Sequence, residues 1–378
     1  MANYWHSKQR NKKLHTLDII RLSKKSIPVS TAWLLGSCME YRGKQDLWIQ
    51  QKPEALNALR EQAIIQSVES SNRIEGVTIP SHRLRPIILE KAKPKDRPEE
   101  ELAGYRHALD WISNLERDLK LTPSIIQKLH EFSQGGFSGD AGKWKNKNNE
   151  IIEILPNGDQ KIRFIPISPQ ETPEAMDTLC KNYHLINEDG QIPILLNIAT
   201  LIFDFLCIHP FRDGNGRVSR LITTLLLKNN NFNVGNYISL ERLVEQTKVE
   251  YYEVLEKCSQ GWHESKNDII PWWNYFLSTL RRAYKEFEQR VDSLCQQSKE
   301  FEQKVFLENK KPVKTELIKN MILQQTGHFT LSDLSSHLPS TSRQLIKKVL
   351  SDLKKSGKVC LSGKGRGAYW EIVNFPEI

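Results

Sequence analysis

Residues 209 to 220, HPFRDGNGRVSR, place one histidine, one carboxylate, a Gly-Asn-Gly turn and two arginines close together. Gly214 and Gly216 permit backbone conformations with positive φ at the start of a predicted helix, so backbone N–H groups there can converge on an anion. Arg217 and Arg220 project from the same side of the first helical turn. Their charge adds to the helix dipole, which makes a bound polyanion the natural compensation. The segment therefore predicts a phosphate site.

Two further side chains of this segment could take part in chemistry. Asp213 would be repelled by bare phosphate, but a carboxylate can hold a hard divalent cation that bridges phosphate oxygens, and Mg²⁺ is the expected ion. His209 ends an apolar run, and an ordinary histidine pKa of about 6.5 suits it to take a proton from a hydroxyl near neutral pH. Taken singly, each residue also fits a structural role: a packed histidine, a plain turn or an arginine facing water.

The whole segment resembles the signature of the Fic family, His-x-Phe-x-Asp/Glu-Gly-Asn-Gly-Arg-x-x-Arg, and matches it at every fixed position. The resemblance implies Mg²⁺-dependent transfer of AMP from ATP to a protein Ser, Thr or Tyr hydroxyl, with the protein itself as one acceptor. It implies His209 as general base, Asp213 as metal ligand and Phe211 as a core anchor. The implied nucleotide contacts are Gly214, Asn215, Gly216 and Arg217 at the α- and β-phosphates and Arg220 at the γ-phosphate. No G-x-x-x-x-G-K-[ST] pattern occurs, which excludes a P-loop ATPase.

A second stretch, SSNRIEG at 70–76, resembles the inhibitory motif of the family, Ser/Thr-x-x-x-Glu-Gly/Asn, through Ser71, Glu75 and Gly76. Gly76 is predicted to follow a helix end, so Glu75 would carry a negative charge where the helix dipole disfavours it. Because the stretch precedes the Fic-like motif, the chain resembles the class whose inhibitory helix is N-terminal to the catalytic core. We expect a Glu75–Arg220 pair in the place of the γ-phosphate. The alternative is an ordinary helix end.

The surrounding sequence is mostly helical in its periodicity. Apolar residues recur at three- and four-residue steps over 53–76, 99–119 and 168–186, which predicts amphipathic helices. Residues 194–209 are apolar nearly all round, which predicts a buried central helix that ends just before the Fic-like motif.

The exception is a pair of β-prone runs at about 151–166, separated by Pro156, Asn157, Gly158 and Asp159, which favour a hairpin turn. This hairpin, with Phe164 and Ile165, resembles the flap of the family, which clamps a target segment by β-strand addition. Tyr251 and Tyr252 lie further along the chain, where their rings could stack on adenine, although packing in the core is the favoured role.

Composition sets the class of protein. The 378 residues are 39% hydrophobic, enough for a sizeable core and more than one folding unit. The six cysteines are scattered without a CxxC pair, which argues against a disulfide framework or a zinc module. The basic N-terminus lacks a following apolar stretch, and the apolar runs are too short to span a bilayer. We therefore expect a soluble, cytoplasmic protein without a membrane partner.

The C-terminal part is basic. Residues 311–378 hold eleven Lys and Arg against five Asp and Glu, a net of +6 within a total of +9. Three helical stretches followed by two β-prone runs resemble a winged helix-turn-helix. This predicts a possible DNA partner, with Arg343, Gln344 and Lys347 on the recognition helix and Lys364 and Arg366 at the wing tip. The alternative is a winged helix used for protein contacts or homodimer formation.

The sequence thus predicts a mainly α protein, in which a Fic-type helical bundle with a small β-hairpin flap is joined to a C-terminal winged-helix domain. The expected regions are 1–98 with the inhibitory helix at about 53–76, the catalytic core at 99–280, a connecting helix at 281–310 and the winged helix at 311–378. Two alternative functions stay open. One is hydrolytic removal of AMP, with Glu75 positioning the water, and the other is a DNA-binding regulator whose Fic core senses a nucleotide.

Overall fold

The computed structural model describes residues 16–51, 53–115, 119–135, 139–154, 159–308, 314–323, 325, 328–337, 341–363 and 368–373. The predicted turn residues Pro156, Asn157 and Gly158 and the predicted wing residues Lys364 and Arg366 lie outside the described residues. The chain divides into two compact units, Met1–Arg290 and Val291–Ile378, and each is treated separately.

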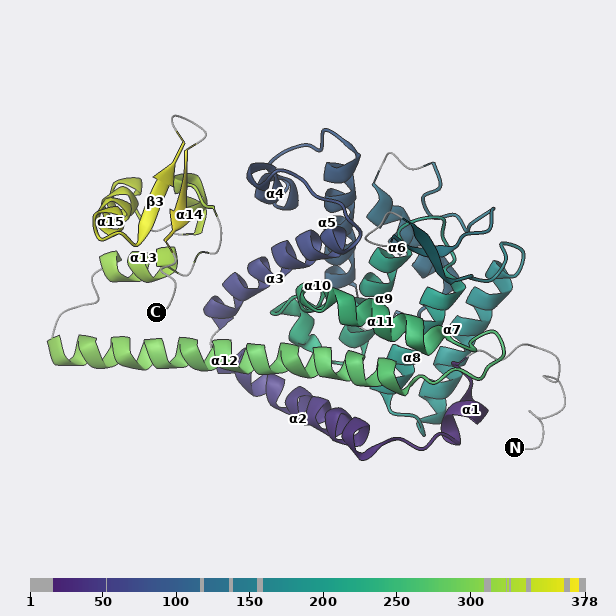
Figure 1. Cartoon of the computed structure of the whole chain (residues 1–378). Coiled ribbons are helices and arrows are strands. Elements are labelled where there is room, and N and C mark those ends of the chain that lie inside the picture. Colours follow the sequence, from purple (N-terminus) through teal and green to yellow (C-terminus); the bar gives the residue numbers. More distant parts are fainter. Residues whose placement is uncertain are drawn as a thin grey trace. The chain divides into compact units, whose positions relative to one another are not determined.

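The first unit is built almost entirely of helices (Figure 1). These are α1 (Ile19–Ser23), α2 (Val29–Gln51), α3 (Pro53–Ile74), α4 (Ser81–Ile88), α5 (Arg97–Asn114), α6 (Pro123–Gln134), α7 (Thr172–Asp189), α8 (Ile194–Ile208), α9 (Asn215–Asn229), a 3₁₀ turn (Asn233–Asn236), α10 (Leu240–Gln246) and α11 (Lys248–Ser259). A long helix, α12 (Ile270–Glu308), begins in this unit. The helices predicted over 53–76, 99–119, 168–186 and 194–209 are present as α3, α5, α7 and α8.

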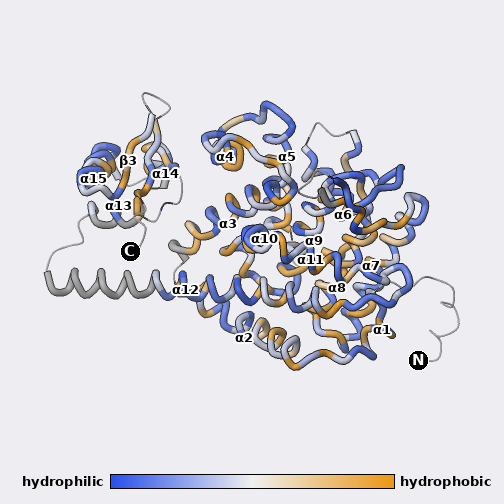
Figure 2. The backbone as a smooth tube through the Cα atoms, viewed as in Figure 1, coloured by the Kyte–Doolittle hydropathy of each residue, from blue (hydrophilic) through white to orange (hydrophobic). Residues whose placement is uncertain are grey.

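Helix α8 forms the centre of the first unit. Nearly all of its side chains are buried, as its continuous apolar sequence predicts. Its one carboxylate, Asp204, accepts hydrogen bonds from the backbone N–H of Leu17 at 2.7 Å and from Nε1 of Trp262 at 2.8 Å. The charge is therefore buried with partners, as an interior carboxylate requires. Along the amphipathic helices around α8, hydrophobic and hydrophilic residues alternate, which Figure 2 shows clearly for α3.

A β-hairpin joins α6 to α7. Strands β1 (Ile151–Ile154) and β2 (Gln160–Phe164) pair antiparallel, with an irregularity between Ile151 and Ile152. The Phe164 ring stacks on His263 at 5.2 Å between centroids, and Nε2 of His263 donates to the carbonyl of Ile165 at 2.8 Å. These contacts fix the C-terminal end of the hairpin, whereas the Ile165 side chain is 56% exposed.

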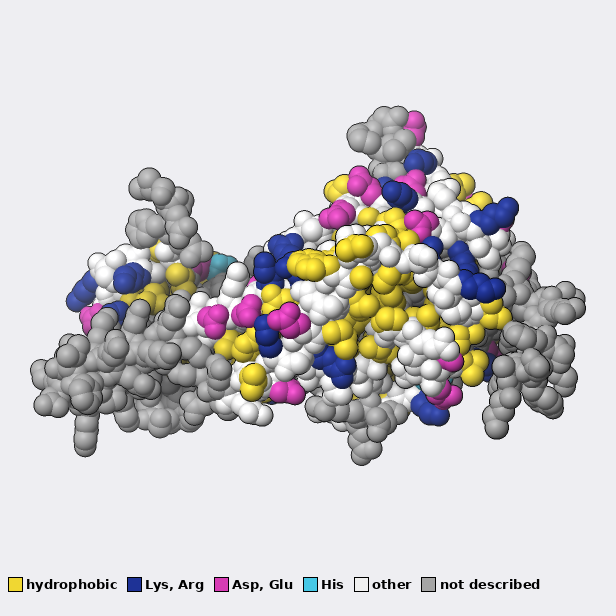
Figure 3. Space-filling model, turned by 90° about the horizontal axis from the view of Figure 1, so that it is seen from below, with side chains coloured by type: hydrophobic (Ala, Val, Ile, Leu, Met, Phe, Trp, Pro, Cys, Tyr) yellow, Lys and Arg dark blue, Asp and Glu magenta, His cyan; other side chains and the backbone are white. Residues whose placement is uncertain are grey.

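Helix α2 carries several exposed hydrophobic side chains, namely Val29, Trp33, Met39 and Leu47. Figure 3 is the view from the side of the first unit on which α2 lies, and it shows hydrophobic side chains gathered there. A protein partner could cover such a surface, and the homodimer stays a prediction. In the part of the chain that the structure describes, no helix is long and apolar enough to cross a bilayer.

The second unit contains α13 (Lys314–Leu323), α14 (Leu331–His337) and α15 (Arg343–Lys355), followed by antiparallel strands β3 (Val359–Ser362) and β4 (Tyr369–Ile372). A bridge between Phe329 and Trp370 adds a short third edge to the sheet. The core consists of Ile318, Ile322, Phe329, Leu334, Ile346, Val349, Leu350, Leu353 and Val359. Arg343, Gln344 and Lys347 are exposed on α15. The elements occur in the predicted order, and their assignment as a winged helix stays a prediction.

Candidate active site

His209 directly follows α8 and adopts a left-handed backbone conformation with a φ of 51°. Its Nδ1 lies 3.1 Å from the carbonyl oxygen of Leu206. Because a carbonyl can only accept, Nδ1 carries the proton and Nε2 keeps a free lone pair. Burial lowers the pKa of His209 to about 4 rather than leaving it near 6.5. At neutral pH the imidazole is therefore unprotonated, and it is a weaker base than the sequence alone suggests.

The loop after His209 is closed by Asn215, the first residue of α9. The Asn215 Oδ1 accepts from the backbone N–H of Phe211 at 2.9 Å, and its Nδ2 donates to the Phe211 carbonyl at 2.8 Å. The Phe211 ring is fully buried, as expected of a core anchor, and stacks on His130 at 3.8 Å. The Asn215 side chain is thus engaged within the loop, so the group it can present to a phosphate is its backbone N–H.

The N-terminus of α9 begins at Gly214, which has a φ of 78°. A Cβ at Gly214 would lie 2.3 Å from Nε2 of Gln134, so this close approach also requires glycine. No side chain in the described part of the chain caps α9 by a hydrogen bond. The uncapped N–H groups and the positive end of the helix dipole are therefore suited to an anion, and the anion site that the Gly-Asn-Gly sequence predicts stays a prediction.

The segment SSNRIEG lies directly over this anion site. Arg220 Nη2 is 2.8 Å from Oε1 of Glu75, and the same guanidinium donates to Oγ and to the carbonyl of Ser71, both at 2.9 Å. A Cβ at Gly216 would lie only 2.2 Å from Glu75 Oε1. Burial by itself would lower the pKa of Arg220, but the attraction of Glu75 raises it above its usual value. A carboxylate of the chain itself therefore occupies the N-terminus of α9.

The end of α3 explains how Glu75 is placed there. Gly76 has a φ of 82°, its N–H bonds to the Arg73 carbonyl at 3.0 Å, and the N–H of Val77 bonds to the Asn72 carbonyl at 2.9 Å. This is the Schellman arrangement, in which Gly76 is the left-handed residue and Glu75 caps the helix. The predicted Gly76 position is confirmed, and it turns the chain immediately after Glu75.

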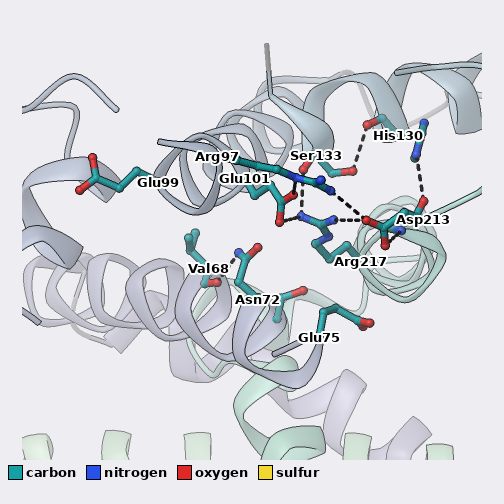
Figure 4. A network of polar contacts seen from close by, with 12 residues as sticks. Val68, Asn72, Glu75, Arg97, Glu99, Glu101, His130, Ser133, Asp213 and Arg217 are labelled. Atoms are coloured by element: carbon teal, nitrogen blue, oxygen red, sulfur yellow. Dashed lines mark hydrogen bonds and ion pairs between the residues drawn. The ribbon is translucent and has the colours of Figure 1, made fainter. Parts of the chain in front are cut away.

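Arg217, the other arginine, belongs to a separate network with residues of α5 and α6 (Figure 4). Its Nη1 lies 2.8 Å from Oε2 of Glu101 and 3.4 Å from the Ser133 carbonyl, and its side chain is only 2% exposed. The two arginines therefore already have carboxylate partners, Glu101 and Glu75. The Glu75–Arg220 pair is the one expected from the sequence, whereas the Arg217–Glu101 pair was not predicted and shows that a carboxylate of the chain balances this arginine without a bound polyanion.

Asp213 lies at the exposed edge of the same network. Its Oδ2 is 3.1 Å from Arg97 Nη2 and 4.0 Å from Arg217 Nη2, and Arg97 is also bound to Glu101 at 2.7 Å (Figure 4). The Asp213 side chain is 64% exposed. Among the described residues, no cluster of three or more His, Cys, Asp or Glu side chains could hold a metal ion. A single open carboxylate beside an anion site nevertheless fits Mg²⁺, which takes its remaining ligands from phosphate and water.

Several residues of the site have no counterpart in the sequence-based prediction. They are Arg97, Glu101, His130, Lys145 and Asn149 around the His209 loop, and Ser67, Tyr105, Ser239 and Glu241 beneath α3. His130 accepts from Gly142 N–H at Nδ1 (3.0 Å) and donates from Nε2 to the Asp213 carbonyl (3.1 Å). No local pattern singles these residues out, because several of them lie in loops or at helix starts and their partners are mostly distant in the sequence.

Beneath α3, a buried chain of hydrogen bonds ties this helix to its neighbours. Ser67 Oγ donates to Ser239 Oγ at 2.9 Å, and the Ser239 hydroxyl lies 3.3 Å from Oε2 of Glu241. The Tyr105 hydroxyl donates to Oε1 of the same carboxylate at 2.9 Å. Helix α3 is thereby fastened to α10 and, through Glu241, to α5.

The two tyrosines predicted near adenine have different surroundings. Tyr251 is 5% exposed and packs against Trp272 and Tyr275, with ring centroids at 5.9 and 5.7 Å. Its contacts are those of core packing, the role the sequence favoured. Tyr252 is half-buried, with the Arg163 guanidinium 5.9 Å from its ring centroid. Contact of either residue with adenine stays a prediction.

The helical fold around the HPFRDGNGRVSR loop defines the class. Residues 120–227 match the model of the Fic/DOC family. The chain is 24% identical over 230 residues to "Protein adenylyltransferase Fic" of Nematostella vectensis. This alignment covers 59% of this chain and 48% of that relative. It is 23% identical over 257 residues to the protein of the same name from Drosophila virilis, covering 66% and 48%. The chain thus spans about half the length of these curated relatives.

Solved structures show the same fold. A Fic family protein from Desulfovibrio desulfuricans G20 superimposes with a TM-score of 0.57 at 18% identity, covering 94% of this chain and 99% of that one. A Fic domain containing signaling protein from Bacteroides thetaiotaomicron VPI-5482 gives a TM-score of 0.58 at 22% identity, covering 68% and 97%.

Proposed function

We propose that the protein is an adenylyltransferase that transfers AMP from ATP to a Ser, Thr or Tyr hydroxyl of a protein, itself included. The observation that carries the proposal is an unprotonated His209 with Nε2 free, directly before a helix N-terminus suited to phosphate. In the reaction, the target hydroxyl loses its proton to Nε2 while its oxygen bonds to the α-phosphorus. The bond between that phosphorus and the oxygen bridging to the β-phosphate breaks, and pyrophosphate leaves.

The nucleotide would lie along the N-terminus of α9. Backbone N–H groups of Gly214, Asn215 and Gly216 would meet the α- and β-phosphates, with Arg217 adding charge from beneath, and Arg220 would meet the γ-phosphate. Asp213 would hold Mg²⁺, which neutralises phosphate charge when bound. The unpartnered, buried Nη1 of Arg220 and the space above Gly216, which only a glycine leaves open, support this placement.

The same site would be self-inhibited. Glu75 pairs with Arg220 and lies over Gly216, where a γ-phosphate would otherwise reach the arginine. ATP could then bind only with its α-phosphorus out of line for attack by the hydroxyl. Ser71 and Gly76 would support this state, the first by binding Arg220 and the second by turning the chain after Glu75.

The target segment would be bound along the hairpin β1–β2. An exposed strand edge can accept another strand through main-chain hydrogen bonds, and Phe164 and Ile165 would hold the base of this flap.

Incubation with ATP labelled at the α-phosphate tests transfer and inhibition together. Glu75→Gly should raise self-labelling by about tenfold or more. Glu75→Gly combined with His209→Ala should lose about a hundredfold or more of that activity while still binding ATP. Near-normal labelling without His209 would remove the histidine from the mechanism, and unchanged labelling by Glu75→Gly would remove the inhibition.

Removal of AMP is a second candidate, favoured by the position of the Glu75 carboxylate above Gly216, where it could orient a water. In that case Glu75→Gly should abolish release of AMP from a modified protein. The same variant therefore separates the two directions of reaction.

A DNA partner is a candidate for the second unit, supported by the exposed Arg343, Gln344 and Lys347 of α15. Duplex binding by the full chain should weaken steeply with salt and should fall when Arg343 and Lys347 are replaced by alanine. Absence of binding at low salt in an anisotropy titration would leave a protein-binding role for this unit.

A further inference from the structure

The turn that carries His209 is held by the segment just before the hairpin. Four consecutive carbonyls, those of residues 208–211, accept hydrogen bonds from only two residues of that segment. Lys145 donates from Nζ to Ile208 O at 3.0 Å and from its backbone N–H to Pro210 O at 2.8 Å. Asn149 donates from Nδ2 to His209 O at 3.3 Å and to Phe211 O at 3.0 Å. Neither residue belongs to the Fic signature.

These hydrogen bonds satisfy carbonyl groups that the turn at His209 leaves without helical partners. His209 has a positive φ, which a non-glycine residue adopts at some cost, and the carbonyls around such a reversal cannot continue the helical hydrogen bonds of α8. Lys145 and Asn149 supply the missing donors, and they are joined to each other because Lys145 Nζ also donates to Asn149 Oδ1 at 2.9 Å. The two residues therefore act on the turn as one clamp.

Lys145 also brings a charge. Its side chain is buried, with the residue 4% exposed, and its ammonium group donates hydrogen bonds to neutral oxygens of Asn149 and Ile208, while the Glu171 carboxylate attracts it without a direct hydrogen bond. Burial lowers the pKa of Lys145 to about 8, so the side chain is still mostly protonated at neutral pH. Burying a charged lysine costs free energy, and a neutral donor could bind the same carbonyls. The presence of lysine here therefore points to a role for its charge.

We propose that Lys145, with Asn149, is a positioning residue that fixes the orientation of His209 through the carbonyls of its turn and places a positive charge near the imidazole that opposes its protonation. The role of His209 as base rests on the function proposed above, whereas the clamp itself rests on the hydrogen bonds.

Three charged groups face His209 from the surrounding elements. Glu75 at the end of α3 and Asp213 before α9 favour the protonated imidazole, and Lys145 opposes it. Removing the Lys145 charge should therefore raise the pKa of His209. Because the unprotonated form is the base, the acidic limb of the pH–rate profile should move to higher pH.

The test compares Lys145→Met with Lys147→Met in the full chain carrying Glu75→Gly. Methionine keeps the apolar stem of lysine and removes its charge and donors, and Lys147 is an exposed lysine two residues away that serves as the matched control. We expect Lys145→Met to lower kcat for AMP transfer roughly tenfold to a hundredfold. The KM for ATP should change less than about twofold, because the phosphate contacts are elsewhere. Lys145→Arg should recover a large part of kcat, and Lys147→Met should leave both constants unchanged.

A second readout does not depend on activity. Nitrogen NMR of the His209 imidazole reports which nitrogen carries the proton and how much of the ring is protonated at a given pH. Lys145→Met should increase the protonated fraction at mildly acidic pH. Should Lys145→Met fail to fold, Asn149→Ala provides the same test of the turn, since Asn149 is half-buried and water can replace part of its side chain. Asn149→Ala should lower the fraction of His209 that is protonated at Nδ1, and it should lower kcat, as Lys145→Met does.

An unchanged His209 protonation state and tautomer in the folded variants would overturn the inference. A chain without AMP transfer that still shows the Lys145-dependent change would instead keep the clamp and reject the proposed reaction.

Discussion

The two faces of α9 hold the same kind of ion pair in different ways. On the α5 side, Arg217 and Glu101 have side chains only 2% and 4% exposed, and Arg97 binds the second oxygen of Glu101. On the α3 side, the Arg220 side chain is 8% exposed, but the Glu75 side chain is 29% exposed, and Glu75 is the residue that caps the C-terminus of α3.

This difference separates a fixed pair from a replaceable one. Glu101 is enclosed, so a departing carboxylate would leave the buried Arg217 charge with only the Ser133 carbonyl at 3.4 Å and the exposed Asp213 at 4.0 Å. Glu75 has an open path to solvent, and its place at a helix C-terminus is opposed by the dipole. In the proposed function, an incoming phosphate would therefore replace Glu75 at Arg220 but would not replace Glu101 at Arg217. The sequence predicted the partner of Arg220 but not that of Arg217, and the elements packed against each arginine determine how open its partner is to solvent.

The largest expected effect is on stability. Glu101→Gln should lower the free energy of unfolding by about 3–5 kcal/mol, because it leaves the Arg217 charge buried and unbalanced. Glu75→Gln should cost about 1 kcal/mol or less, since Arg220 keeps Ser71 and gains access to water, and an unfavourable helix-end charge disappears. Urea denaturation of both variants at neutral pH measures the difference, and equal losses would contradict the distinction between the two faces.

The next effect concerns the γ-phosphate. In the His209→Ala background, ATP and ADP should bind with affinities within about twofold, because Glu75 keeps Arg220 from the third phosphate. Adding Glu75→Gly should make ATP bind roughly tenfold to a hundredfold more tightly than ADP, the value of one charge-assisted arginine contact. Isothermal titration calorimetry gives both ratios. A ratio near one in both proteins would mean that Arg220 does not meet the γ-phosphate.

The smallest effect concerns Asp213. Arg97→Gln removes an exposed partner from the carboxylate proposed to hold Mg²⁺, and exposed pairs contribute about 0.2–1 kcal/mol. The Mg²⁺ concentration that half-saturates nucleotide binding should therefore fall by up to about fivefold. Arg212→Gln is the control, because Arg212 is exposed next to Asp213 but is paired with Asp140. If Arg212→Gln lowered this Mg²⁺ concentration as much as Arg97→Gln, the effect would come from the general surface charge and not from the pairing of Arg97 with Asp213.

A feature could be predicted from the sequence when the residues that determine it lie within a few positions of one another. The helices, the hairpin and Gly76 depend on periodicity and turn residues within a few positions, and they are found where predicted. The contact of Glu75 with Arg220 spans 145 residues, and it was predictable only because both residues lie in motifs that resemble a family. Glu101 and Lys145 are equally important to the geometry, but the partners that make them so, Arg217 and the carbonyls of Ile208 and Pro210, lie far away in the chain. No local pattern distinguishes these two residues from surface charges.

The hydrogen-bonded chain through Ser67, Ser239, Glu241 and Tyr105 has a consequence for time scales. Because these groups are buried, lifting α3 away would require breaking several interior contacts together, which is a slow local unfolding event. A change of rotamer at the partly exposed Glu75 needs none of that and takes nanoseconds. Under the proposed inhibition, the inactive form is therefore one of two rapidly exchanging populations. The rate of the unmodified protein divided by the rate of Glu75→Gly should equal the fraction of time that the Glu75 side chain spends away from Arg220.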